Sequence, residues 1–168
     1  CRVLDIGTGS GCIAITLGKR LADAAVTSWD VSELALQIAS SNARHNGVTV
    51  AFDRVDVLAD GIPEIHVDVL VSNPPYVTEK EREGMERNVL DWEPEQALFV
   101  PDDDPLLFYR EIARQGMFIL DKGGCLYFEI NRAYGKETFD LLVRLGYQNV
   151  ELRKDSFGNN RMIKAVKP

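Results

Sequence analysis

The chain has 168 residues, of which 45% are hydrophobic and 27% are charged, which is enough to bury the core of a single domain over residues 1–168. Its formal net charge of −7 argues against a protein that holds duplex nucleic acid by neutralising phosphates. Three cysteines without CxxC spacing, only two histidines and the lack of a long apolar run indicate a cytoplasmic protein with no metal site and no membrane segment.

Strand-like and helix-like segments alternate along the chain, which opens on a core strand without an initiating Met, as expected for a domain excised from a longer protein. The apolar patterns predict strands at 3–6, 26–29, 49–54, 67–72 and 125–130, and helices at 12–21, 32–45, 105–120 and 136–145. This βαβ repetition predicts an α/β fold whose sheet is mainly parallel and covered by helices on both faces. The last strands, 149–153 and 162–166, are joined through KDSFGNN, too short for a helical crossover, so they are predicted to close the sheet as an antiparallel hairpin.

The turn after the first strand is rich in glycine. The stretch DIGTGSG places Gly7, Gly9 and Gly11 after Asp5, where a ligand can approach backbone N–H groups because no Cβ intervenes. A tight strand-to-helix turn explains one or two glycines, whereas three at alternate positions favour a cofactor loop. Their spacing differs from the GxGxxG fingerprint, which disfavours a nicotinamide or flavin dinucleotide.

Two acidic residues follow the next two strands. Asp30 lies about twenty residues after the glycines, where a carboxylate in such folds can accept both hydrogen bonds of a ribose diol. Its alternative role is helix capping, for which Ser32 is the better residue. Asp56 and the backbone of Val57 occupy the next position along the same edge, where Asp56 either meets an adenine edge or lies in a solvated turn.

The strand at 67–72 ends in VSNPPYV. Pro74 and Pro75 lack backbone N–H groups, so they end the strand at Asn73. Each proline also pushes the residue before it toward extended geometry, which predicts a stiff turn with fixed hydrogen-bond acceptors. The sequence is compatible with a cis or a trans bond before each proline.

Residues 76–105 form a long connection of mixed periodicity, which in a compact domain is typical of a lid or a binding loop. The acidic run at 102–104 just before Pro105 is interpreted as a solvated helix start rather than a cation site. His66 precedes a strand without an evident partner and is not assigned to catalysis.

Together these stretches resemble the class I methyltransferases that use S-adenosylmethionine, and more narrowly the release-factor glutamine methyltransferases of the HemK/PrmC type. The resemblance covers essentially the whole chain, through VLDIGTGSGCIAITL, VSNPPYV, WEPEQALF, GGCLYFEI and DSFGNNRM. Asn131 stands where many relatives carry Gly, and the family's upstream helical domain, which helps to hold the release factor, is absent from this chain. Glu93 and Pro94 look like part of the family's substrate-side loop.

The resemblance implies a Rossmann-like seven-stranded fold and a methyl transfer from S-adenosylmethionine to the Gln side-chain amide of the Gly-Gly-Gln motif in class I peptide chain release factors. The planar NH2 is a poor nucleophile, so we expect the Asn73 side-chain oxygen and the Pro74 carbonyl to orient it by accepting its two N–H groups. Tyr76 then packs against the amide or the cofactor, or else fills the core. Substrate binding is assigned to Asn73, Pro74, Pro75 and Tyr76. Cofactor binding is assigned to Asp5, Gly7, Thr8, Gly9, Ser10, Gly11, Asp30, Asp56, Val57 and Asn73.

Two other functions stay open from the sequence. Similar Asn/Asp-Pro-Pro-Tyr turns occur in nucleic-acid amino-methyltransferases that act on adenine or guanine, although these usually carry extra basic surface. The third hypothesis is a non-catalytic protein with a cofactor-binding fold that serves only to bind a partner. The presence of both the glycine loop and the Asn-Pro-Pro-Tyr turn argues against it.

Overall fold

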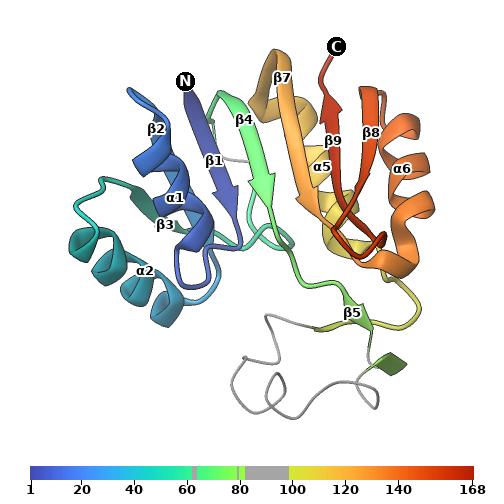
Figure 1. The fold of residues 1–168 in the computed structure, drawn as a ribbon, viewed down its shortest axis with the longest axis horizontal. Coiled ribbons are helices and arrows are strands. Elements are labelled where there is room, and N and C mark those ends of the chain that lie inside the picture. Colours follow the sequence, from blue (N-terminus) through green and yellow to red (C-terminus); the bar gives the residue numbers. More distant parts are fainter. Residues whose placement is uncertain (62–63, 79, 82–98) are drawn as a thin grey trace.

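Seven strands form one sheet in the computed structural model, which describes residues 1–61, 64–78, 80–81 and 99–168 (Figure 1). The strands of this sheet are β1 (Arg2–Ile6), β2 (Ala25–Asp30), β3 (Ala51–Arg54), β4 (Val67–Ser72), β7 (Leu120–Glu129), β8 (Gln148–Lys154) and β9 (Asn160–Val166). Their order is β3-β2-β1-β4-β7-β9-β8, and β9 runs antiparallel to both of its neighbours. The predicted α/β class with a mainly parallel sheet and a closing antiparallel hairpin is therefore confirmed.

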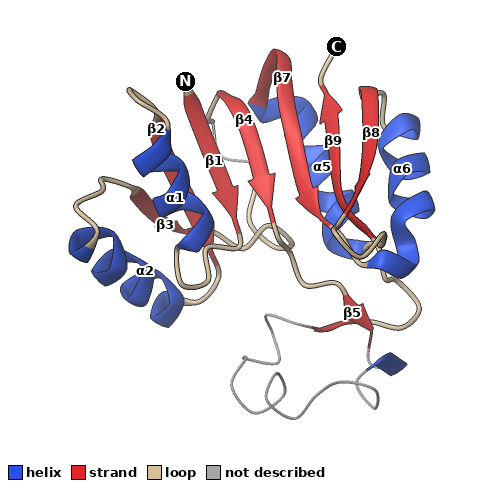
Figure 2. Cartoon of the chain, viewed as in Figure 1, coloured by secondary structure: helices blue, strands red, loops and turns tan. Residues whose placement is uncertain are grey.

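Helices lie on both faces of this sheet. They are α1 (Cys12–Arg20), α2 (Glu33–His45), α5 (Leu107–Ile119) and α6 (Gly135–Arg144), with a short 3-10 helix η2 (Arg132–Tyr134) before α6. In Figure 2, α1 lies in front of the sheet and α5 lies behind it. None of the described helices combines the length and the apolar character that crossing a bilayer requires.

Side chains of the central strands alternate between two apolar clusters, because successive residues of a strand point to opposite faces. On β1, Val3 packs in a cluster with Ala14 of α1, whereas Leu4 packs in the larger cluster with Ile112 of α5. Leu70 of β4 belongs to the larger cluster and is fully buried. Burial on both faces explains why these strands are nearly continuous apolar runs.

The start of α2 is set by a local capping signal, whereas the start of β7 is set by pairing with a distant strand. Helix α2 begins at Glu33, directly after Ser32, whose side chain accepts a hydrogen bond from the Ala35 backbone N–H at 3.2 Å. Ser32 is thus the N-cap that the sequence predicted. Strand β7 begins at Leu120 instead of the predicted residue 125, since a register shift in its pairing with β4 adds a bridge between Val67 and Leu120.

Two further strands, β5 (Val77–Thr78) and β6 (Phe99–Val100), were not predicted. They pair in parallel with each other, outside the main sheet. Both fall in the long connection, whose residues Glu93 and Pro94 lie outside the described residues.

The burial of Leu70 leads to a stability prediction. Leu70→Ala should lower the free energy of unfolding by about 2–5 kcal/mol, because a fully buried leucine leaves a cavity that the sheet cannot close. Leu34→Ala on the exposed side of α2, where Leu34 is 67% exposed, is the matched control and should change it by less than about 0.5 kcal/mol. Urea denaturation followed by circular dichroism measures both, and equal losses would contradict the assignment of Leu70 to the core.

Candidate active site

Two of the predicted site segments, the glycine loop and the Asn-Pro-Pro-Tyr turn, follow β1 and β4. These strands pair in parallel with Ile6 opposite Ser72, and the Ser72 hydroxyl donates to the Ile6 carbonyl at 2.6 Å. The loops that follow therefore leave the sheet side by side. A Cβ added to Gly7 would lie 3.5 Å from the Asn73 carbonyl oxygen. The glycine loop and the Asn-Pro-Pro-Tyr turn are thus direct neighbours at the carboxyl edge of the sheet, where open α/β sheets bind ligands.

The glycine loop is held by backbone hydrogen bonds. The backbone N–H of Gly7 donates to the Trp29 carbonyl at 2.8 Å, and that of Gly9 donates to Asp30 Oδ2 at 3.0 Å. Both glycines, like Gly11, have positive φ angles, which side-chain-bearing residues rarely adopt. A Cβ on Gly9 would meet no heavy atom within 4 Å, so the loop is open at this point. The loop is therefore preformed and accessible.

Asp30 connects this loop to α2. Its Oδ2 accepts from Gly9, and its Oδ1 accepts from the Ser32 backbone N–H at 2.8 Å. Each carboxylate oxygen has a second lone pair, so the half-buried side chain retains capacity to accept from a diol. Binding of a ribose by Asp30 stays a prediction. The structure adds a second role for Asp30, which is to hold the glycine loop in position.

Asp5 lies beneath the loop in a buried polar cluster. Its Oδ2 accepts from the Ser28 hydroxyl at 3.0 Å, and this hydroxyl lies 2.7 Å from that of Thr8. Its Oδ1 has no hydrogen-bond partner of good geometry among the described residues. Burial raises the pKa of Asp5 to about 7, although Ser28 and the backbone of Ala14 act to lower it and the charge of Asp30 raises it further. The side chain of Thr8 is thus buried against Ser28.

The next position along this edge belongs to a tight turn. Asp56 Oδ1 accepts from the Leu58 backbone N–H at 2.9 Å, and the Asp56 N–H donates to Asp60 Oδ2 at 2.7 Å. The Val57 carbonyl accepts from the buried side chain of Gln115 at 2.7 Å. Asp56 therefore lies in a turn, which is one of the two alternatives that the sequence left open. Its contact with an adenine edge stays a prediction.

The Asn-Pro-Pro-Tyr turn has a buried base and an exposed tip. Both proline bonds are trans, as are all described peptide bonds. Pro74 is buried and Pro75 half-buried, whereas the Asn73 side chain is exposed and forms no hydrogen bond with another described residue. The Tyr76 hydroxyl donates to Glu129 Oε1 at 3.0 Å, and burial, aided by the Glu129 carboxylate, raises the pKa of Tyr76 to about 12. Within the described part of the chain, no group occupies the Asn73 side-chain oxygen, which can therefore accept a hydrogen bond from a ligand.

Three supporting residues escaped the sequence reasoning. Ser28 is a buried hydroxyl within the apolar stretch AVTSWD, which is the one local signal available for it. Glu129 is the last residue of β7, and Asn131 follows this strand. The sequence distinguishes Asn131 only as a position where many relatives carry Gly, and it indicates a role for neither residue. Asn131 is 5% exposed and donates from Nδ2 to the Tyr76 carbonyl at 3.0 Å. Such contacts join residues far apart in the chain, so local patterns do not reveal them.

The acidic run before α5 is engaged by protein groups. Asp104 pairs with the Arg110 guanidinium at 3.0 Å, and Asp102 accepts from the Lys80 backbone N–H at 3.0 Å. His66 lies 3.6 Å from Asp121, at the opposite edge of the sheet from the site. Within the part of the chain that the structure describes, no three His, Cys, Asp or Glu side chains are grouped to hold a metal ion.

Residues 1–91 match the methyltransferase small domain family. The chain belongs to this family. It is also 56% identical to a release factor glutamine methyltransferase of Bacteroides thetaiotaomicron, over 98% of this chain and 59% of that protein. It is 48% identical to the protein of the same name from Flavobacterium psychrophilum, over 97% of this chain and 57% of that protein. These relatives confirm the resemblance that the sequence indicated.

The present chain has the same fold as a solved structure of a methyltransferase from Pyrococcus furiosus, with a TM-score of 0.72 at 20% identity. The match covers 98% of this chain and 74% of the other. The chain spans less than two thirds of the length of the two curated relatives.

The buried Asp5 carboxyl leads to a prediction about pH. Its pKa of about 7 in the folded chain exceeds the ordinary value of 3.8, so the folded chain keeps a proton that the unfolded chain releases across this window. Stability should therefore fall as the pH rises from about 4 to about 7, by an amount on the order of a few kcal/mol. Asp5→Asn should remove this contribution and flatten the profile of unfolding free energy against pH.

Urea denaturation from pH 4 to pH 8 measures the difference between the wild-type and variant profiles. Asp53→Asn, at an exposed position of β3, is the control and should follow the wild-type profile. Parallel profiles for wild type and Asp5→Asn would show that the Asp5 carboxyl does not titrate in this window.

Proposed function

We propose that this chain transfers a methyl group from S-adenosylmethionine to the side-chain amide nitrogen of the Gln in the Gly-Gly-Gln motif of class I peptide chain release factors. The observation that carries the proposal is the exposed Asn73 amide, unpartnered among the described residues and next to an open glycine loop. The names of the relatives at 56% and 48% identity support the choice of substrate.

The edge residues fit S-adenosylmethionine. Gly9 leaves space over the loop, and Asp30 presents lone pairs at the end of β2. Beneath the loop, Asp5 Oδ1 has no partner of good geometry in the described part of the chain. We assign the ribose to Asp30, the amino-acid portion to the loop over Asp5, and the adenine to the turn at Asp56 and Val57. When bound, S-adenosylmethionine supplies an electrophilic methyl group attached to a sulfonium.

The chain contributes orientation. The lone pair of an amide nitrogen is delocalised into its carbonyl, so the nitrogen reacts only when it is held in line with the methyl group. The Asn73 Oδ1 atom and the Pro74 carbonyl each accept one N–H of the substrate amide, which leaves the face of the nitrogen open. The same oxygens favour the positive charge that develops on nitrogen in the transition state.

The charge of the chain favours a protein substrate over duplex nucleic acid. A net charge of −7 gives no general attraction for phosphates, whereas a glycine-rich protein loop can enter a narrow site without neutralising charge. The curated relatives are longer than this chain, so further contacts with the release factor are assigned to the part of those proteins that this chain does not span.

Asp30→Ala should weaken binding of S-adenosylhomocysteine by about 1–3 kcal/mol, because hydrogen bonds to a charged acceptor are lost. Since Asp30 also accepts from Gly9 and Ser32, a modest drop in melting temperature should accompany this change. Isothermal titration calorimetry and thermal denaturation measure the two effects. An unchanged dissociation constant would place the ribose elsewhere, and tight NAD binding without any response to S-adenosylhomocysteine would reject the cofactor.

Asn73→Ala should lower methyl transfer to a release factor on the order of a hundredfold, because one acceptor of the reacting amide is lost. Affinity for S-adenosylhomocysteine should change little. Mass spectrometry of the digested release factor should show the added methyl on the Gly-Gly-Gln peptide, and Gln→Ala in that motif should abolish it. Duplex DNA is the parallel substrate; methylation of adenine or guanine with an unmodified release factor would favour a nucleic-acid amino-methyltransferase instead.

A further inference from the structure

Asn131 uses its whole side chain to join the end of β7 to the far side of the Asn-Pro-Pro-Tyr turn. Its Nδ2 donates to the Tyr76 carbonyl at 3.0 Å and to Glu81 Oε2 at 3.0 Å. Its Oδ1 accepts from the Ala133 backbone N–H at 2.9 Å and thereby caps η2. Asn131 is 5% exposed, so it does not present a surface to a substrate. The side chain is a buried link between two segments that lie far apart in the sequence.

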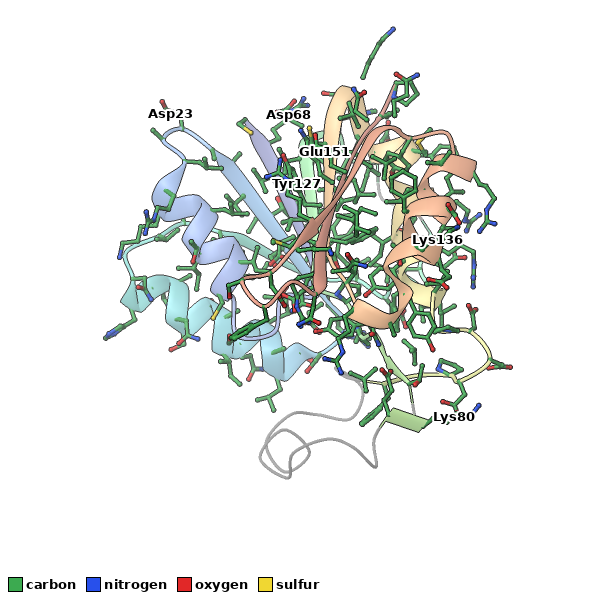
Figure 3. The ribbon with its side chains drawn as sticks, turned by 45° about the vertical axis from the view of Figure 1, so that its right-hand side comes forward. Asp23, Asp68, Lys80, Tyr127, Lys136 and Glu151 are labelled. Atoms are coloured by element: carbon green, nitrogen blue, oxygen red, sulfur yellow. The ribbon has the colours of Figure 1, made fainter. Side chains whose placement is uncertain are left out.

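Glu81 forms the other half of this link. Its Oε2 also accepts from the backbone N–H and the hydroxyl of Thr78, both at 2.9 Å. Burial opposes ionisation of Glu81, but Thr78 and Asn131, with the charge of Arg132, hold its pKa below the ordinary value. The acceptor is therefore a carboxylate, which strengthens these hydrogen bonds. Lys80, the residue before Glu81, lies at the end of the molecule that carries β5, whereas Asp68 lies at the other end (Figure 3).

Tyr76 is consequently held at both ends by residues that close β7. Its carbonyl accepts from Asn131, and its hydroxyl donates to Glu129 at 3.0 Å. The Asn131 backbone N–H in turn donates to the hydroxyl of Tyr109, which is 1% exposed, at 3.1 Å. These bonds tie the exit of the turn to the buried core on the α5 side of the sheet.

We propose that Asn131 is a positioning residue for methyl transfer, acting through the Tyr76 carbonyl and Glu81 to hold the Asn73 and Pro74 acceptors in register with the glycine loop. This inference rests on the proposed function. Orientation is the main contribution of the chain to the reaction, and a displacement of about 1 Å can cost on the order of a hundredfold in rate. Ser72 fixes the entry of the turn to β1, and the Asn131–Glu81 brace fixes its exit to β7.

Asn131→Asp should disrupt the hydrogen bond to Glu81 while it keeps the cap of η2, so it tests the brace alone. The aspartate keeps an oxygen for the Ala133 N–H but replaces the donating NH2 by an acceptor that faces the Glu81 carboxylate. We expect kcat for the release factor to fall about tenfold to a hundredfold, with little change in KM or in the dissociation constant of S-adenosylhomocysteine. Asn46→Ala, which removes the hydrogen bond of 2.9 Å from the Asn46 side-chain amide to the Asn42 carbonyl at the end of α2, is the control and should leave kcat unchanged.

A double-mutant cycle with Glu81→Ala tests whether the two residues act together. If they form one brace, Asn131→Ala and the double variant should lose a similar factor in kcat, so the losses will not multiply. Hydrogen exchange of the Thr78 amide should quicken in Asn131→Asp, a readout independent of activity.

Wild-type kcat in a folded Asn131→Asp variant, or losses that multiply in the cycle, would overturn the positioning role. A wild-type chain that leaves the release factor unmodified would instead reject the proposed function. In that case the brace is judged by the Thr78 exchange alone, and unchanged exchange in Asn131→Asp would overturn it.

Discussion

The parallel pairing of β1 with β4 is the constraint on which the rest of the candidate site depends. Because Ile6 and Ser72 lie opposite each other, the chain leaves both strands at the same level of the sheet. The glycine loop and the Asn-Pro-Pro-Tyr turn are then neighbours, so close that a side chain at position 7 would reach the Asn73 carbonyl. A slip of one residue would turn the side chains of β4 to the opposite faces and exchange its two sets of core contacts.

The two halves of the site are built differently. On the side proposed to bind the cofactor, Asp30 and the Trp29 carbonyl already hold the backbone of the glycine loop, and Asp5 lies beneath it in a buried polar cluster. On the side proposed to bind the substrate, the Asn73 amide has no hydrogen-bond partner among the described residues. A preformed binding loop costs little to order, while unpaired acceptors beside it are available for an amide N–H. This division supports the proposed methyl transfer, in which the chain orients a weakly nucleophilic amide.

The end of β7 supplies the second support of the turn. Glu129 and Asn131, neighbours on either side of Ile130, contact the hydroxyl and the carbonyl of Tyr76. Methyl transfer to an amide and to a base amino group require the same pair of acceptors, so the turn by itself does not select between them. Selection then depends on what surrounds the turn, and the net charge of −7 disfavours duplex nucleic acid.

By itself, the sequence determined the alternation of strands and helices, the Ser32 cap, the end of β4 and the residues of the two loops, because periodicity, capping and proline geometry act over a few neighbouring positions. It also determined the family, whose model matches residues 1–91. Only the tertiary structure decided that Ser28 meets Asp5, that Asp30 holds Gly9, and that Asn131 reaches Tyr76. These contacts require both strand order and side-chain direction, which are settled only when the sheet is assembled.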